Sequence, residues 1–112
     1  MAHKLAKINE LIKLELSQIL LREEEFGEGV LVTVMGVDTT EDQKEATVTF
    51  SVWPDSQRTA ALKKLNAHIW HLQQGINKRL QIHPVPKMRF VINIDEAASQ
   101  HVEELINKIK KD

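Results

Sequence analysis

The sequence predicts an α+β domain in which helices pack on one face of a small three-stranded sheet. Three long segments repeat apolar residues at helical spacing, and three short segments between them have the alternation or the β-branched composition of strands. With 112 residues and 42% hydrophobic content, the chain suffices for one domain, residues 1–112, with a single modest core.

The first half is predicted to form a helix followed by a hairpin. The helix extends from about residue 4 to residue 24, and its apolar stripe is Leu5, Ile8, Leu11, Ile12, Leu16, Ile19 and Leu20. Gly27 and Gly29 end it. Residues 30–37 have the composition of a buried strand, and apolar residues alternate in the next strand at Ala46, Val48, Phe50 and Val52. The polar residues 38–44 between them predict an antiparallel hairpin.

The second half is predicted to add a helix, a strand and a final helix, in the overall order α-β-β-α-β-α. Asp55 or Ser56 is expected to cap the second helix, whose stripe is Leu62, Leu65, Ile69, Leu72, Ile76 and Leu80. It runs to about Ile82, either unbroken or interrupted near its middle, and Pro84 and Pro86 end it. The third strand alternates at Met88, Phe90, Ile92 and Ile94, and Asp95 caps a helix carrying Val102, Leu105, Ile106 and Ile109.

The charge is unevenly distributed although the formal net charge is only −1. No acidic residue lies between Asp55 and Asp95, whereas seven basic ones do: Arg58, Lys63, Lys64, Lys78, Arg79, Lys87 and Arg89. The rest of the chain carries the other 8 basic residues and all 16 acidic ones. A stretch of this kind attracts polyanions, so a nucleic acid is the first candidate partner.

Motifs for catalysis or for metal binding are not found in the sequence. The acidic run Glu23, Glu24, Glu25 with Glu28 is interpreted as a solvated helix end, and His68 and His71 as two surface histidines without further ligands. We therefore expect no enzyme, no cofactor and no metal. Without cysteine, an apolar signal segment or a membrane-length apolar run, a soluble, cytoplasmic protein is expected. We also expect a monomer, with no membrane partner and no small-molecule substrate.

Several local patterns, in order from Leu5 to Ile109, resemble the ribosome-binding factor A family of bacterial small-subunit assembly factors. They are LAKINELIKLELSQILLREE in the first helix, GVLVTVMGVDTTEDQKEATVTFSV in the hairpin, and NKRLQIHPVPKMRFVINID from Asn77 to Asp95. The resemblance implies a KH-like fold of type II and a non-enzymatic factor that assists maturation of 16S-type rRNA in the immature subunit. It implies that the domain lodges near the decoding region and the neck, and leaves once maturation is complete.

The family also has a kinked helix pair with an Ala-x-Gly interruption, from which this sequence departs. Counting back from Pro86 places the interruption at His68-Ile69-Trp70, and counting from Pro84 places it at Asn66-Ala67-His68. Neither is Ala-x-Gly. Either the kink is absent or it has moved, and Gly75 is the candidate for a moved kink.

The RNA-binding residues are predicted within the acid-free stretch: Lys63, Lys64, Lys78, Arg79, His83, Lys87 and Arg89. The last two share one face of the third strand. Trp70 is expected to pack inside the protein, next to Ile69, while Trp53 is the better candidate for an exposed aromatic ring. Two other functions stay open, a KH-like RNA-binding module unrelated to ribosomes and a protein-interaction or dimerisation domain. Assembly factors of this kind are needed most in the cold, so the resemblance further implies a role in cold adaptation.

Overall fold

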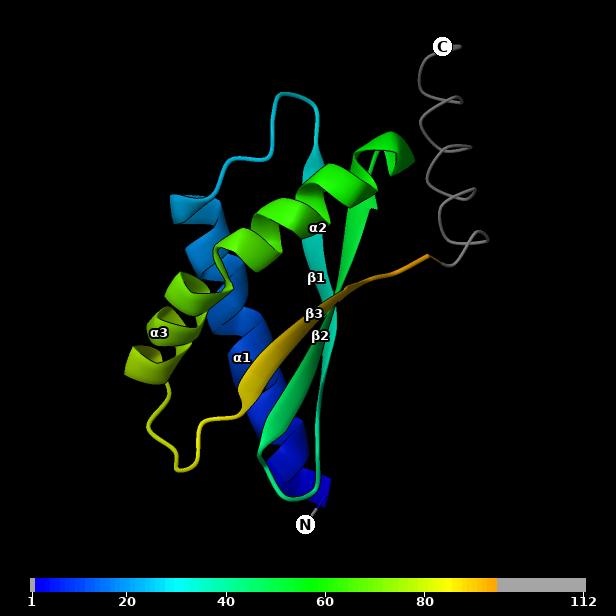
Figure 1. The fold of residues 1–112 in the computed structure, drawn as a ribbon. Helices are drawn as coiled ribbons and strands as arrows, with labels where there is room; N and C mark the ends of the chain where they lie inside the picture. The colour runs from blue at the N-terminus through cyan, green and yellow to red at the C-terminus, as the bar shows by residue number, and fades with distance from the viewer. Residues whose placement is uncertain (1, 95–112) are drawn as a thin grey trace, which may run out of the picture.

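A computed structural model describes residues 2–94 and shows a three-stranded sheet in the order β1-β2-β3 (Figure 1). The strands are β1 (Leu31–Thr39), β2 (Glu45–Trp53) and β3 (Lys87–Ile92). β1 and β2 pair antiparallel, which confirms the predicted hairpin, and β3 pairs parallel to β2. The helix predicted after Asp95 lies outside the described residues.

The pairing of β1 with β2 contains one irregularity. Val34 lies opposite Phe50, but the next pair in register is Gly36 with Thr49, so Met35 is the additional residue of a β-bulge. β1 is an edge strand of this sheet, and Met35 is 49% exposed.

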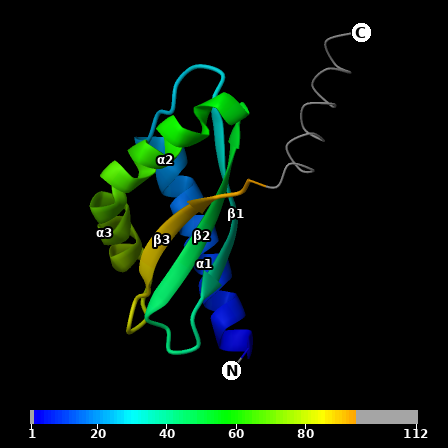
Figure 2. The ribbon, with the colours of Figure 1, turned by 45° about the vertical axis from the view of Figure 1, so that its right-hand side comes forward.

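The helices of the described part cover one face of the sheet (Figures 1 and 2). They are α1 (Ala2–Glu23), α2 (Arg58–Ala67) and α3 (Ile69–Arg79). The alternating side chains of β2 that face them are buried together with the inner residues of the helices: Ile12, Leu16, Ile19, Ala46, Val48, Phe50, Leu65, Leu72 and Ile76. Phe50 and Phe90 meet edge to face, 5.2 Å between ring centres, at the middle of this core. The predicted α+β architecture, with helices on one face, is confirmed.

The start of the second helical segment differs from the prediction. A short 3-10 helix (Asp55–Gln57) precedes α2, and neither Asp55 nor Ser56 caps α2. The residue before α2 is Gln57, whose side chain makes no capping hydrogen bond. Asp55 instead forms an ion pair with Arg58, 3.1 Å away and three residues along the chain. The cap prediction was wrong because the residues directly after Pro54 form the 3-10 helix. Asp55 and Ser56 therefore lie before Gln57, the residue that precedes α2.

The long apolar stripe belongs to two helices, and the chain changes direction between them (Figures 1 and 2). The break is at His68, with φ −104° and ψ 9°, the residue shared by the two counted positions, Asn66-Ala67-His68 and His68-Ile69-Trp70. Because this φ is negative, a histidine can occupy the place without glycine. The prediction that Gly75 marks a moved kink was wrong. Gly75 lies inside α3, where an added Cβ would be 3.0 Å from Cδ1 of Ile19, so it allows α1 and α3 to approach closely.

Side-chain hydrogen bonds fix the helices to the sheet. The amide oxygen of Gln73 in α3 accepts a hydrogen bond from the backbone N–H of Met88 at 2.8 Å, and its nitrogen donates to the carbonyl oxygen of Pro86 at 3.0 Å. On the other side, the side-chain oxygen of Asn9 accepts from both the backbone N–H and the hydroxyl of Thr39, at 3.0 and 2.6 Å. Within residues 2–94, no helix has the length and apolar character that crossing a bilayer requires.

Candidate nucleic-acid interface

The break between α2 and α3 is held by a contact from α1. The carboxylate of Glu24, just beyond the end of α1, lies 2.9 Å from Nδ1 of His68. The Glu24 side chain is only 3% exposed, whereas the His68 side chain is 46% exposed. The interpretation of the acidic run as wholly solvated was therefore wrong for Glu24, which fastens the end of α1 to the bend.

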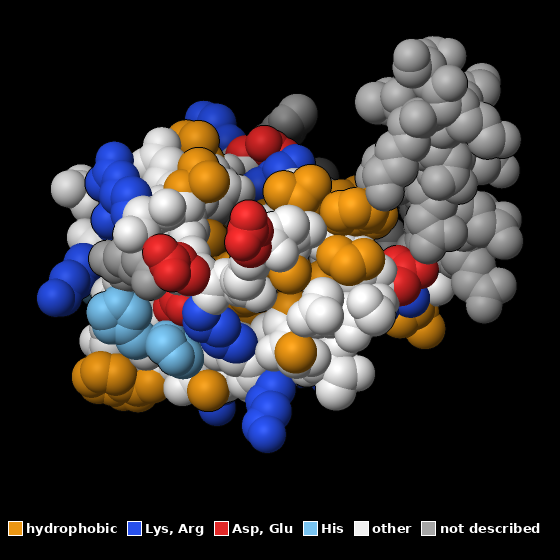
Figure 3. Space-filling model, turned by 90° about the horizontal axis from the view of Figure 1, so that it is seen from above, with side chains coloured by type: hydrophobic (Ala, Val, Ile, Leu, Met, Phe, Trp, Pro, Cys, Tyr) orange, Lys and Arg blue, Asp and Glu red, His pale blue; other side chains and the backbone are white. Residues whose placement is uncertain are grey.

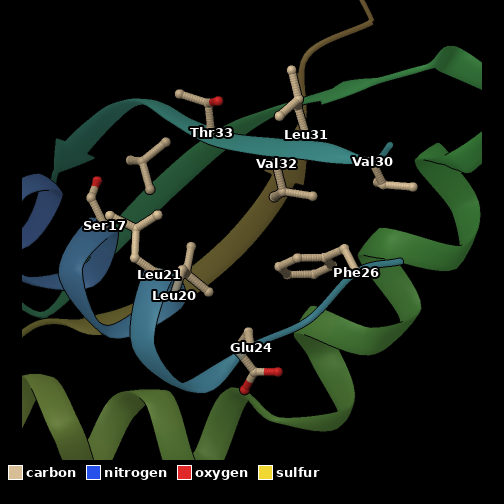
Figure 4. Close-up of a pocket in the computed structure, with 10 residues that line it drawn as sticks. Ser17, Leu20, Leu21, Glu24, Phe26, Val30, Leu31, Val32 and Thr33 are labelled. Atoms are coloured by element: carbon tan, nitrogen blue, oxygen red, sulfur yellow. The ribbon is translucent and has the colours of Figure 1, made fainter. Parts of the chain in front are cut away.

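Glu24 also lines an apolar cavity of about 330 Å³ between the end of α1 and β1 (Figure 4). Leu20 and Leu21 of α1, Phe26 of the following loop and Val32 of β1 surround it. Its walls are mainly apolar, and Ser17, Glu24 and Thr33 are the polar residues among those that line it. Among the described residues, no three His, Cys, Asp or Glu side chains gather as a metal site would require.

The two predicted lysines of α2 differ in exposure. Lys63 is exposed and has no ion-pair partner in the described part of the chain. Lys64 is half-buried, with its ammonium nitrogen 5.2 Å from the centre of the Phe26 ring, a cation–π contact. Lys63 is therefore the freer of the two to meet a phosphate.

Lys78 and Arg79 form the exposed last turn of α3. Arg79 donates to a carboxylate oxygen of Glu15 in α1 at 3.2 Å, so part of its charge is neutralised. Lys78 has no carboxylate within ion-pair distance among residues 2–94. His83 is exposed in the loop that joins α3 to β3.

Lys87 and Arg89 lie on the other side of the molecule from the helices. They alternate along β3 with the buried Met88 and Phe90, so their side chains are on the open face of the sheet. The register places Lys87 beside Glu45, and Arg89 beside Thr47, whose other neighbour is Asp38. Each cation of this face thus shares a row with an acid, which lowers its local positive potential.

The predicted site residues consequently occupy two surfaces, which we call the helix surface (Lys63, Lys64, Lys78, Arg79) and the sheet surface (Lys87, Arg89). The loop with His83 connects them. The predicted residues do not form one continuous face, because the strand alternation turns Lys87 and Arg89 away from the helices. In the view of Figure 3, basic and histidine side chains likewise lie among acidic and hydrophobic ones.

The exposures of the two tryptophans are the reverse of those predicted. Trp70 is 73% exposed, whereas Trp53 is half-buried at the end of β2. Trp70 follows Ile69, which suggested a buried position, but it precedes the fully buried Leu72 by two residues. Two residues correspond to about 200° around a helix, so Leu72 points inward while Trp70 points out. Trp70 thus joins the helix surface, and spacing from Leu72 is the signal that would have revealed it.

Comparison with known proteins shows the same family along nearly the whole chain. The profile of ribosome-binding factor A matches residues 4–106. The ribosome-binding factor A of Akkermansia muciniphila is 30% identical over 110 residues, which cover 98% of this chain and 85% of that protein.

Solved structures show that the fold is shared as well. The crystal structure of ribosome-binding factor A from Thermus thermophilus superposes with a TM-score of 0.64 at 21% identity, covering 79% of this chain and 94% of that one. The T. thermophilus factor as fitted into the cryo-EM map of its complex with the 30S subunit also gives 0.64 at 21% identity, covering 82% and 93%. The fold is therefore the KH-like fold of these structures, and the chain belongs to the ribosome-binding factor A family.

Proposed function

We propose that this chain is an assembly factor that binds immature small ribosomal subunits and assists the maturation of their 16S-type rRNA. The observation that carries the proposal is the match to the ribosome-binding factor A family over residues 4–106. The T. thermophilus relative fitted into a map of its complex with the 30S subunit supports the choice of partner. The chain works without catalysis or a cofactor, by occupying rRNA and holding it in an immature arrangement.

The rRNA contacts come from the basic residues of the acid-free stretch: Lys63, Lys64, Lys78, Arg79, His83, Lys87 and Arg89. The helix surface provides the larger share, because Lys63 and Lys78 are exposed and are not offset by neighbouring carboxylates within residues 2–94. Contacts of this type read the shape and charge of the RNA backbone rather than base identity. The factor acts as a cytoplasmic, single-domain monomer. It is needed most in the cold, where misfolded rRNA rearranges most slowly.

Sedimentation with ribosomal particles tests this function. The protein is expected to co-sediment with free small subunits at low salt and to dissociate at high salt, because phosphate contacts release counterions. The triple variant K78E/R79E/R89E is expected to lose most of this binding. K4E/K7E/K44E changes three exposed lysines outside the acid-free stretch, alters the net charge equally, and should bind like the wild type.

The outcomes separate the alternatives. Intact particle binding by K78E/R79E/R89E would refute the site, and binding to RNA without preference for small subunits would indicate a general KH-like module. Because reversal at Arg79 also places a second carboxylate beside Glu15, thermal unfolding of each variant must accompany the assay.

A protein-interaction role is the second candidate, and one observation favours it. Leu11, Leu14 and Leu21 on the outer side of α1 are 42%, 55% and 87% exposed. Exposed leucines at this spacing are typical of a helix that meets another helix. Sedimentation equilibrium of the wild type and of L14E/L21E decides: a dimer that the double variant abolishes would support this role.

A further inference from the structure

The most exposed large aromatic side chain of the described residues belongs to α3. Trp70 has 73% of its surface accessible. It borders a shallow depression of about 470 Å³ whose lining includes Trp70, His71, Gln74, Gly75, Lys78 and Arg79. An indole left in water has an apolar face available to a partner.

The helix places the aromatic ring and a cation in one row. Trp70, Gln74 and Lys78 follow one another at intervals of four residues, so they lie along the same side of α3. Lys78 is about 12 Å from Trp70 along the helix axis. The row is rigidly placed, because Gln73 bonds α3 to the start of β3 and Gly75 seats α3 directly against Ile19 of α1.

The charges around the ring favour a nucleic acid over a protein as the occupant. Lys78 has no carboxylate within ion-pair distance among residues 2–94, and Arg79 keeps part of its guanidinium exposed beside Glu15. No acidic residue lies on α2 or α3. An aromatic face with cations further along the same side of the helix suits a single strand, in which one base stacks on the indole while a phosphate further along meets the ammonium group of Lys78.

We propose that Trp70 stacks on an unpaired rRNA base while Lys78 contacts a phosphate of the same strand. This inference rests on the proposed function and names the RNA element that the helix surface recognises: a single strand, a bulge or a loop. A base inside a duplex has both faces covered by its neighbours and cannot engage the indole.

Fluorescence with a short RNA tests the stacking directly. In W53F, Trp70 is the sole tryptophan. Its emission is expected to fall to a saturating level on addition of single-stranded octauridylate, and to respond much less to the same length of duplex RNA. In the otherwise native protein, W70A should weaken octauridylate binding roughly 5- to 100-fold, as measured by anisotropy of labelled RNA. W70F should retain most of the affinity, because phenylalanine still offers a ring.

Two results would overturn the inference: equal octauridylate affinity of W70A and wild type, or quenching that is as strong with duplex as with single strand. W70A should melt at the wild-type temperature, since the ring is exposed, so lost folding is separable from lost stacking. Sedimentation with small subunits distinguishes a failure of the stacking from a failure of the proposed function. If the wild type binds these particles while W70A binds them and octauridylate unchanged, only the stacking is wrong; if the wild type itself fails to bind them, the proposed function is wrong.

Discussion

Asp42 shows how one exposed residue defines the turn between β1 and β2. Its carboxylate accepts a hydrogen bond from the hydroxyl of Thr40 at 2.6 Å and from the backbone N–H of Lys44 at 3.1 Å. These two bonds, the Thr40 hydroxyl first, hold the pKa of Asp42 below its ordinary value. The next residue, Gln43, adopts φ 63° and donates from its side chain to the carbonyl oxygen of Pro84 at 2.7 Å, so the turn is also tied to the proline loop.

The lowered pKa makes a prediction about acid stability. The folded state binds the Asp42 proton more weakly than the unfolded state does, so the ionised carboxylate stabilises the fold. This stabilisation is present above the unfolded pKa, about pH 4, and is lost as the pH falls through the folded pKa. D42N keeps an acceptor oxygen but does not titrate. Its melting temperature should lie below that of the wild type at pH 6, and the difference should shrink as the pH falls below about 4. E41Q, in the same turn, serves as control; melting curves of D42N that run parallel to the wild type would contradict the prediction.

At the scale of the elements, the contact of α1 with α3 decides where the outer residues of α3 point. A Cβ added to Gly75 would lie 3.0 Å from Cδ1 of Ile19, so Ile19, which is 1% exposed, would have to shift by a few tenths of an ångström. Since α3 carries both Trp70 and Lys78, this small residue positions the helix surface without touching a partner.

G75A and I19V should therefore be coupled. Alanine favours the helix by about 1 kcal/mol, but overpacking a buried contact costs about 1–3 kcal/mol, so G75A is expected to lower the free energy of unfolding by about 1 kcal/mol. I19V alone should cost about 1 kcal/mol. Because valine lacks the Cδ1 that the new methyl group meets, the double variant should be more stable than additivity predicts. Urea unfolding of all four proteins measures the coupling, and strictly additive costs would disprove it.

For the whole molecule, periodicity predicted the elements well and predicted surfaces poorly. The stripe from Leu62 to Leu80 is the same for one helix or two, so the break at His68 could not be located from it. The residue at the break contacts Glu24, 44 residues earlier in the chain, and periodicity does not report such a contact. Alternation correctly placed Lys87 and Arg89 on the same face of β3. Only the sheet register shows that Glu45 lies beside Lys87 and that Asp38 lies in the same row as Arg89. Distance along the sequence cannot report which charges meet across strands.

Because the cations of the helix surface and of the sheet surface differ in their acidic neighbours, reversing the charge of single residues should have unequal effects on binding. K78E should weaken small-subunit binding about five- to tenfold, because it removes an uncompensated cation and adds a repelling charge worth about 1 kcal/mol at a surface. R89E should weaken it less, since its row already holds an acid, and the control K4E should change it least. Affinity titrations at several salt concentrations measure both the loss and the slope. An R89E defect larger than that of K78E would move the main contact to the sheet surface.

The β-bulge at Met35 has a consequence for the behaviour of the protein in concentrated solution. A regular edge strand displays an unbroken row of N–H and C=O groups, onto which a strand from another molecule can add. The extra residue between Val34 and Gly36 interrupts that row midway along β1 and increases its local twist. Within residues 2–94, the outer edge of β1 is thereby a poor template for the addition of a strand from another molecule.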